Sequence, residues 1–387
     1  MSLTSADVAA PGPSLLDAAS LLAEVADELV VKTVRDTHLA ALDRVGTVTR
    51  GRNPLHRGIA GAVYAGLGVG LRSASRGLDA VAATGVGPRL ESGPRGRFVS
   101  SAVNGLIGDR LVRERPQLAI PMGVRLRGAD VDITVDGLAA AYPEATGRLV
   151  LFLHGLCENE SYFQRHRDRL GTTYAEMLAG LGWTPLMLRA NTGLPLRENG
   201  AALTALVQRV VDAWPVPVAR IALVGHSLGG LVIRAAGAVA DDVEEPWRER
   251  VSDVVTLGTP HLGAPIARGI GHGSRGLGRL PETAAFGRIL DWRSHGVHDL
   301  VAGLAEDVPP LPHARYRLVA ATLTASQRHP VGDVVGDLLV RPRSAYGRDR
   351  RGRDLFPGGE VLHVGRSGHF DLLNHPEVHT ALKRWLA

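Results

Sequence analysis

The sequence predicts an α/β fold in which a mainly parallel sheet is covered by helices on both faces. Beyond residue 115, short β-branched or leucine-rich runs alternate with helical patterns, as in parallel strands joined by helices. Several of the runs, such as RLVLFL at 148–153 and RIALV at 220–224, are almost continuously apolar. Strands that are buried on both faces of a sheet have this composition.

Residues 1–115 lack this alternation and are predicted to form a helical segment with a linker. The stretch 14–31 repeats apolar side chains at helical spacing, which indicates an amphipathic helix. The stretch 84–97 is rich in Gly, Pro and Arg without apolar periodicity, as a linker is. We therefore place a domain boundary near residue 115 and expect the segment to dock on residues 116–387, with an acidic surface such as anionic lipid as the alternative.

Composition and charge argue against several functions and locations. The chain has 387 residues and a net charge of +5, but its dense basic cluster at 341–353 contains one aromatic residue, Tyr346. Nucleic-acid binders interleave such charge with stacking aromatics, so we expect no nucleic acid. Cys157 is the only cysteine, which excludes an intrachain disulfide. No signal peptide or membrane span is apparent, since the apolar run at 58–71 is too short. We expect a cytoplasmic protein, with peripheral membrane contact through the N-terminal segment as an option.

The elements after residue 115 follow in order from these patterns. The first two predicted strands are close in sequence and are expected to form an antiparallel opening hairpin, and the others are expected to be parallel. The predicted strands are GVRLRG (123–128), VDITVDG (131–137), RLVLFLHG (148–155), TPLMLRAN (184–191), RIALVGHS (220–227), VSDVVTLGTP (251–260), YRLVAATL (316–323) and EVLHVGRS (360–367).

The stretch IALVGHSLGGLVIRA at 221–235 places Ser227 between a predicted strand and a predicted helix. A serine at this turn adopts a strained, positive-φ conformation that exposes its hydroxyl beyond the strand. Its close neighbours must be small, which explains Gly225 and Gly229 on either side of His226 and Ser227. The motif therefore predicts a nucleophile elbow.

Two backbone N–H groups are candidates for an oxyanion hole beside this serine. Leu228 begins the new helix, whose unpaired N–H groups and dipole favour negative charge. Leu156 follows the strand and the His154–Gly155 turn, where a second donor is expected. His154 itself can equally be a turn histidine, and Cys157 a buried filler.

A serine nucleophile needs a base and an acid, which follow it in the order Asp or Glu, then His. His369 lies between the last predicted strand and a final helix opened by Pro376, and is the predicted base. Two aspartates after the strand at 316–323 compete for the role of acid, Asp337 and Asp333. We favour Asp337, although Asp333 stays an alternative because the triad is defined by geometry.

The chain from about 145 onward resembles the α/β-hydrolase esterases and lipases, and within them bacterial relatives of the GPI inositol-deacylase-like branch. The resemblance rests on HGLCENE, RANTGLPLRENG, GHSLGGLVIRAA, LGTPHLGAP, GDLLVRPRSA and GHFDLLNHP in family order. It implies the α/β-hydrolase fold, with Ser227 as nucleophile, Asp337 as acid and His369 as base. One departure follows the acid, where Leu338 replaces the usual glycine.

These residues predict a serine carboxylester hydrolase that acts on a small-molecule or lipid ester through an acyl-enzyme and needs no metal or organic cofactor. Acyl transfer by the same triad and a non-catalytic binding module are the alternatives. A glycine-rich insertion at about 262–312 is predicted to form a lid. Asn191, Thr192, Thr259 and His261 also follow predicted strands, and we expect them to serve local turn hydrogen bonding.

Overall fold

The computed structural model describes residues 14–25, 69–71, 73–81, 84, 89–239, 243–264, 294–304, 308–326, 329, 336–349 and 351–387. They fall into two compact units. The larger unit contains Ser101–Arg113 and the described residues of Ala119–Gly269 and Arg293–Ala387. The smaller unit contains the described residues of Met1–Ser100 and Glu114–Leu118.

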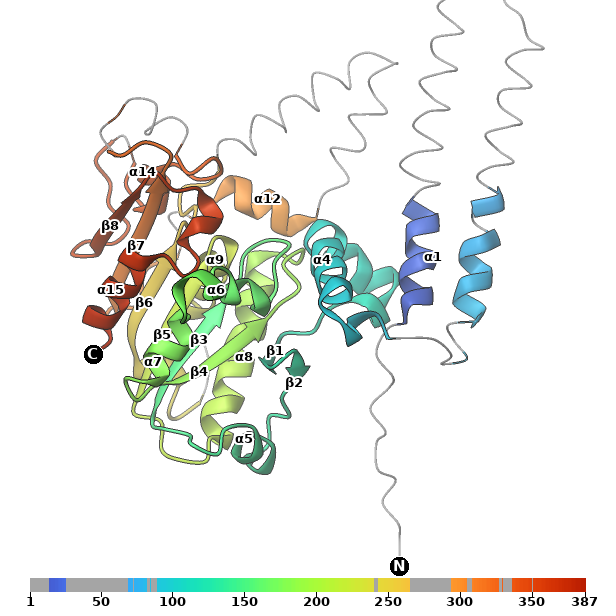
Figure 1. Cartoon of the computed structure of the whole chain (residues 1–387), viewed down its shortest axis with the longest axis horizontal. Helices are drawn as coiled ribbons and strands as arrows, with labels where there is room; N and C mark the ends of the chain where they lie inside the picture. The colour runs from blue at the N-terminus through green and yellow to red at the C-terminus, as the bar shows by residue number, and fades with distance from the viewer. Residues whose placement is uncertain are drawn as a thin grey trace, which may run out of the picture. The chain divides into compact units, whose positions relative to one another are not determined.

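The larger unit is built on a sheet of eight strands among the described residues, in the order β2-β1-β4-β3-β5-β6-β7-β8 (Figure 1). β1 pairs antiparallel with β2 and β4, and every other neighbouring pair is parallel. The predicted mainly parallel sheet is confirmed. The strands are β1 Gly123–Leu126, β2 Ala129–Asp130, β3 Arg148–Leu153, β4 Thr184–Arg189, β5 Arg220–His226, β6 Val251–Leu257, β7 Arg315–Thr322 and β8 Glu360–Gly365.

The opening hairpin is present, but its second strand differs from the prediction. β2 ends at Asp130, which pairs with Arg125. The N–H of Val131 still donates to the carbonyl of Val124 at 2.9 Å, and the rest of the sequence VDITVDG leaves the sheet. Thr134 instead caps α5, Val135–Ala141, by accepting a 3.1 Å hydrogen bond from the N–H of Gly137. A threonine cap favours helix initiation over continuation of the β-branched run.

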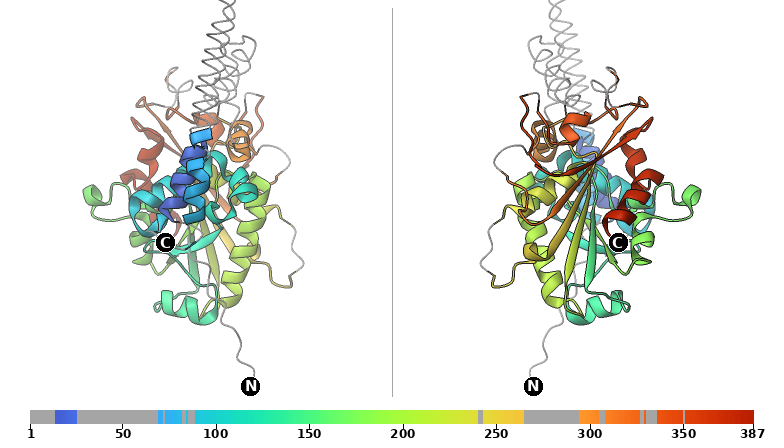
Figure 2. Two further views of the ribbon diagram at one scale, coloured as in Figure 1. Left: turned by 90° about the vertical axis from the view of Figure 1, so that its right-hand side faces the viewer. Right: turned by 90° about the vertical axis from the view of Figure 1, so that its left-hand side faces the viewer.

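Helices cover both faces of the sheet (Figure 2). Successive side chains of a strand point to opposite faces: in β3, Leu149, Leu151 and Leu153 belong to one hydrophobic cluster, and Val150 and Phe152 to the other. The first cluster includes residues of α5, α8 and α9, and the second includes residues of α7 and α15. Burial on both faces is the reason that these strands are apolar throughout. The helices of the larger unit not yet delimited are η4 Glu160–Gln164, α6 Arg167–Leu170, α7 Tyr174–Ala179, α8 Leu196–Ala213, α9 Leu228–Gly237, η5 Trp247–Arg250, α12 His295–Ala302, α14 Pro342–Ala345, η6 His369–Leu372 and α15 Pro376–Trp385.

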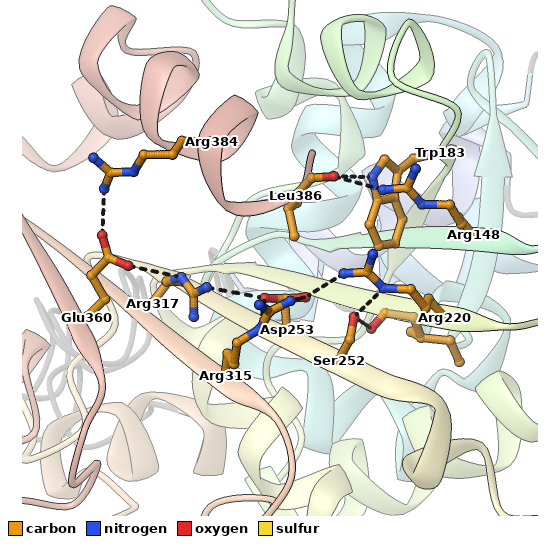
Figure 3. A network of polar contacts seen from close by, with 11 residues as sticks. Arg148, Trp183, Arg220, Ser252, Asp253, Arg315, Arg317, Glu360, Arg384 and Leu386 are labelled. Atoms are coloured by element: carbon orange, nitrogen blue, oxygen red, sulfur yellow. Dashed lines mark hydrogen bonds and ion pairs between the residues drawn. The ribbon is translucent and has the colours of Figure 1, made fainter.

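Charged side chains pair with one another at the amino ends of the parallel strands (Figure 3). Asp253 of β6 is fully buried and lies 3.3 Å from Arg220, 3.2 Å from Arg315 and 3.6 Å from Arg317. Arg317 also lies 3.5 Å from Glu360 at the start of β8. Each of these charged side chains is therefore paired with an opposite charge of the same fold. The opposite edge, beyond the carboxyl ends of the strands, is where open parallel sheets place their ligand sites.

The smaller unit contains α1 Leu15–Val25, η2 Leu90–Ser92, η3 Pro116–Leu118 and the beginning of α4 Pro94–Glu114. Its described residues are joined by polar contacts, including a 2.9 Å hydrogen bond between the hydroxyls of Ser20 and Ser75. The predicted amphipathic helix is present as α1, and residues 26–31 of that prediction lie outside the described residues.

Residues 101–113 of α4 lie in the larger unit. Asn104 accepts a 2.9 Å hydrogen bond from the N–H of Ile120, and the carbonyl of Gly108 accepts one of 3.1 Å from the Asn191 amide. The C-terminal part of α4 therefore buttresses the loop after β4. No helix within the described ranges has the length and apolar character required to cross a bilayer.

The predicted insertion at 262–312 is described only in part, since residues 265–293 and 305–307 lie outside the described residues. The portion after residue 293 is tied to the sheet unit. Ser294 donates a 2.7 Å hydrogen bond to the carbonyl of Gly105, and Asp299 accepts one of 2.8 Å from the N–H of Leu196. Leu304 is buried in the first hydrophobic cluster. The lid role of the insertion at 262–312 remains a prediction.

Candidate active site

Ser227 occupies the turn between β5 and α9, as predicted from the G-x-S-x-G pattern. Its backbone angles are φ 52° and ψ −123°, a conformation that strains any residue with a Cβ atom. A Cβ added to Gly225 would lie 2.6 Å from the N atom of Gly230, and one added to Gly229 would lie 2.4 Å from the carbonyl O of Leu153. The two glycines are thus required by close backbone packing around the serine.

Asp337 and His369 are brought together beyond the ends of β7 and β8. His369 Nδ1 lies 2.7 Å from Asp337 Oδ2, and both side chains are buried. Asp337 Oδ1 accepts hydrogen bonds from the N–H groups of Leu339 and Val340, at 2.9 and 2.7 Å. These contacts hold the carboxylate in place and fix the proton of His369 on Nδ1. The alternative acid, Asp333, lies outside the described residues.

His369 presents its second ring nitrogen without a partner. Nε2 is buried and has no hydrogen-bond partner among the residues that the structure describes. A Cβ added to Gly258, after β6, would lie 3.1 Å from the His369 ring. His369 therefore packs over the end of β6, the neighbour of the strand that carries Ser227. An unpaired buried acceptor at this edge is available to a proton donor.

The turn after β3 packs directly against Ser227. A Cβ added to Gly155 would lie 2.8 Å from the Cβ of Ser227. Leu156 follows in this turn and Leu228 is the first residue of α9. Within the described part of the chain, neither of their N–H groups has a hydrogen-bond acceptor. These are the two donors that the sequence predicted for an oxyanion hole.

His154 and Cys157 have structural surroundings in this turn. His154 Nε2 accepts a 3.2 Å hydrogen bond from the N–H of Ala190, and burial lowers the pKa of the ring. The half-buried thiol of Cys157 lies 3.6 Å from the carbonyl of Ala102. Burial, assisted by the charge of Glu158, raises the pKa of Cys157 to about 11. A neutral thiol is a poor nucleophile.

Of the side chains after β4 and β6, Asn191 has the local turn bond that was expected, because its Oδ1 accepts the N–H of Gly193 at 3.1 Å. The hydroxyl of Thr192 instead accepts the N–H of Cys157, 35 residues away, at 3.1 Å, and the buried hydroxyl of Thr259 has no hydrogen-bond partner among the described residues. His261 is fully buried, lies 3.3 Å from the hydroxyl of Thr256, and has a pKa far below the usual value because of its burial. It is therefore neutral at physiological pH.

Sequence reasoning did not single out Glu158. Its carboxylate is buried 2.9 Å from Nδ1 of His226, the residue before Ser227, and accepts the N–H of Gly155 at 2.8 Å. The only feature of the sequence that could have indicated Glu158 is its position three residues after Gly155. Carboxylates at such positions are common on protein surfaces, and only the fold shows that this one is buried.

Residues 143–272, about a third of the chain, match the family described as "Putative serine esterase". Solved structures similar to this chain include a Bacillus licheniformis lipase in its mature form, 20% identical, covering 62% of this chain and 92% of that one with a TM-score of 0.44. Lipase 1 of Pelosinus fermentans is 14% identical and covers 62% and 99%, with a TM-score of 0.41. A Bacillus subtilis carboxylesterase is 15% identical and covers 62% and 82%, with a TM-score of 0.35.

The narrower resemblance to the GPI inositol-deacylase-like branch stays a prediction. The sheet supports the wider family, because its parallel strands carry a strained serine turn between β5 and α9 and place a buried Asp–His pair after β7 and β8. Together with the match over residues 143–272, this arrangement is similar to that of α/β-hydrolases of the esterase and lipase kind.

Proposed function

We propose that this chain is a serine carboxylester hydrolase that acts through Ser227, His369 and Asp337. The observation that carries the proposal is the buried Asp337–His369 pair, whose free Nε2 lies at the strand edge that also holds the strained Ser227 turn. A nucleophile, a base oriented by a carboxylate, and nearby backbone donors are the parts that acyl transfer to water requires.

In this mechanism Ser227 Oγ bonds to the ester carbonyl carbon while its proton passes to His369 Nε2. The carbonyl oxygen becomes an oxyanion, which the N–H groups of Leu156 and Leu228 stabilise. The tetrahedral intermediate then expels the alcohol, which takes the proton from His369. Water, deprotonated by His369, hydrolyses the acyl-enzyme and releases the acid. Asp337 orients the imidazole and stabilises its protonated form.

Apolar side chains around the Asp–His pair favour an ester with an apolar acyl or alcohol group. Phe370 follows His369 and is 37% exposed, and Leu338 and Leu339 follow Asp337 with 52% and 41% exposure. Large exposed apolar side chains next to a reactive pair are more consistent with an apolar ligand than with a highly charged one.

The test is hydrolysis of p-nitrophenyl esters from acetate to palmitate, with Ser227→Ala as the control. We expect the wild-type chain to turn over at least part of the series and to be labelled by a fluorophosphonate. The variant should lose at least about 10³-fold in kcat, together with labelling, because the nucleophile is removed. A wild-type chain that neither hydrolyses the esters nor reacts with the probe would contradict the proposal.

A further inference from the structure

A second carboxylate–imidazole pair lies immediately behind the proposed triad and has no role in the mechanism above. It joins Glu158, in the turn after β3, to His226, the last residue of β5. Glu158 Oε2 lies 2.9 Å from His226 Nδ1, and the side chains are 4% and 0% exposed. The ring of His226 is 4.8 Å from that of His369, centroid to centroid.

Both ring nitrogens of His226 face atoms that only accept hydrogen bonds. Nδ1 faces the Glu158 carboxylate, and Nε2 lies 3.3 Å from the backbone carbonyl O of His369. A neutral imidazole has one N–H and would leave one of these buried contacts without a proton, whereas an imidazolium donates to both. The geometry therefore favours the doubly protonated ring.

The electrostatics of the pair agree with this assignment. Burial by itself would lower the pKa of His226, but the Glu158 carboxylate and its hydrogen bond raise it above the usual value, with further support from the His369 carbonyl and the Asp337 charge. Burial would likewise raise the pKa of Glu158, yet the charge and hydrogen bond of His226, and the N–H of Gly155, lower it. Both directions favour the charged forms.

Three further titratable groups that interact electrostatically with Glu158 are uncharged at neutral pH. Burial lowers the pKa of His154. Burial and the Glu158 charge raise the pKa of Cys157 to about 11 and that of Tyr162 above its usual value. All three groups are therefore neutral, and of these neighbours only His226 is a cation that can pair with the Glu158 carboxylate.

The Glu158–His226 pair connects the turn after β3 to the loop that carries His369, and the reaction requires these two loops to keep a fixed relative position. On one side, Glu158 Oε2 accepts the Gly155 N–H at 2.8 Å and so fixes the turn that presents Leu156. On the other side, His226 holds the main chain of His369. The two loops are far apart in sequence, and the residue that joins them through its ring directly precedes Ser227.

We propose that Glu158 and His226 are positioning residues: His226, as an imidazolium, clamps the main chain of the base His369 while Glu158 clamps the oxyanion turn. The proposal rests on the proposed esterase mechanism. Neither residue touches the reacting atoms. Their contribution is to keep nucleophile, base and oxyanion donors within the narrow geometry that the reaction requires, where a displacement of about 1 Å costs about 10²-fold in rate.

The charge state is tested first, by imidazole ¹⁵N NMR on the full chain, with His226→Gln used to assign the signal. We expect the His226 ring to lose its proton at a higher pH than an ordinary histidine, whose pKa is near 6.5, because its pKa is raised by Glu158. In Glu158→Gln the same ring should lose its proton at a lower pH than in the wild-type chain. A wild-type His226 that loses its proton at or below the pH of an ordinary histidine would overturn the proposal.

The kinetic test compares Glu158→Gln with Glu160→Gln, which is the same substitution two residues away. Glu160 is also buried but pairs with Arg125, at 3.4 Å. We expect Glu158→Gln to lower kcat for p-nitrophenyl butyrate by about 10²-fold, with little change in KM, and Glu160→Gln to keep kcat within about twofold. The alkaline limb of the kcat profile should move to lower pH in Glu158→Gln, because His226 then loses its proton earlier.

Unchanged kcat and an unmoved alkaline limb in Glu158→Gln would overturn the positioning role. Failure of the esterase proposal is distinguishable, since it appears as a wild-type chain without Ser227-dependent turnover, while the NMR result still decides the charge state. If Glu158→Gln does not fold, Glu158→Asp replaces it, since it keeps the charge but shortens the reach. For Glu158→Asp, a kcat loss smaller than about 10²-fold, with the alkaline limb of the kcat profile at its wild-type pH, supports the proposal. A kcat equal to that of the wild type in Glu158→Asp contradicts it.

Discussion

Replacing Asp337 by Asn tests the proposed acid sharply, because the structure dictates how the new amide must be oriented. Asp337 Oδ1 accepts two backbone N–H groups, from Leu339 and Val340, and Oδ2 accepts one proton from His369. If the amide NH₂ replaced Oδ1, both backbone donors would face a donor and lose their acceptor. Each unsatisfied donor costs about 1–3 kcal/mol, so the amide oxygen takes the Oδ1 position.

The NH₂ group of the substituted side chain must then face Nδ1 of His369. That nitrogen has to accept a hydrogen bond, so the ring proton moves to Nε2 and the base can no longer take the proton of Ser227. We expect kcat to fall on the order of 10⁴-fold, as for the wrong tautomer in a serine triad. This corresponds to about 5.5 kcal/mol in the activation barrier. The melting temperature should change little, since both backbone hydrogen bonds are kept.

The assay is kcat for p-nitrophenyl butyrate at neutral pH, together with thermal unfolding. Asp337→Ala is the matched variant that should lose both activity and stability, because it leaves two N–H groups without an acceptor. Asp333→Asn should stay near the wild-type kcat. The reasoning fails if Asp337→Asn keeps kcat within about tenfold of the wild type, or if the large loss occurs at Asp333 instead.

Three further outcomes are expected. Ser227→Gly and Ser227→Ala should both be inactive. The glycine variant should unfold at the higher temperature, because positive φ strains a residue with a Cβ by about 1–3 kcal/mol. A higher thermal unfolding midpoint for the alanine variant would contradict this. A chain of residues 94–387 should melt higher than one of residues 116–387, because residues 101–113 of α4 supply hydrogen-bond acceptors to the sheet unit; equal midpoints would show that α4 is dispensable. Deleting residues 268–290 and bridging the gap with a short loop should change the preference for acyl length more than the kcat/KM for acetate, and unchanged relative rates across the ester series would count against a lid.

The sequence alone determined the features that depend on near neighbours along the chain. Apolar runs without alternation predicted strands buried on both faces, and the structure has them in β3, β5 and β6. The glycines around Ser227 predicted a strained turn between a strand and a helix, which the structure shows. Such patterns can be recognised in the sequence because backbone conformation and strand burial depend on residues that are close together in the chain.

Features formed between distant residues were decided by the tertiary structure. Asp337 meets His369 across 32 residues, and Glu158 meets His226 across 68. Neither pairing has a local signature, because which loops meet depends on the strand order β3-β5-β6-β7-β8 and on the parallel direction that brings the carboxyl ends to one edge. A carboxylate in a turn is equally compatible with solvent and with an ion pair. Its role is set by the side chains that the other strands deliver to the same edge of the sheet.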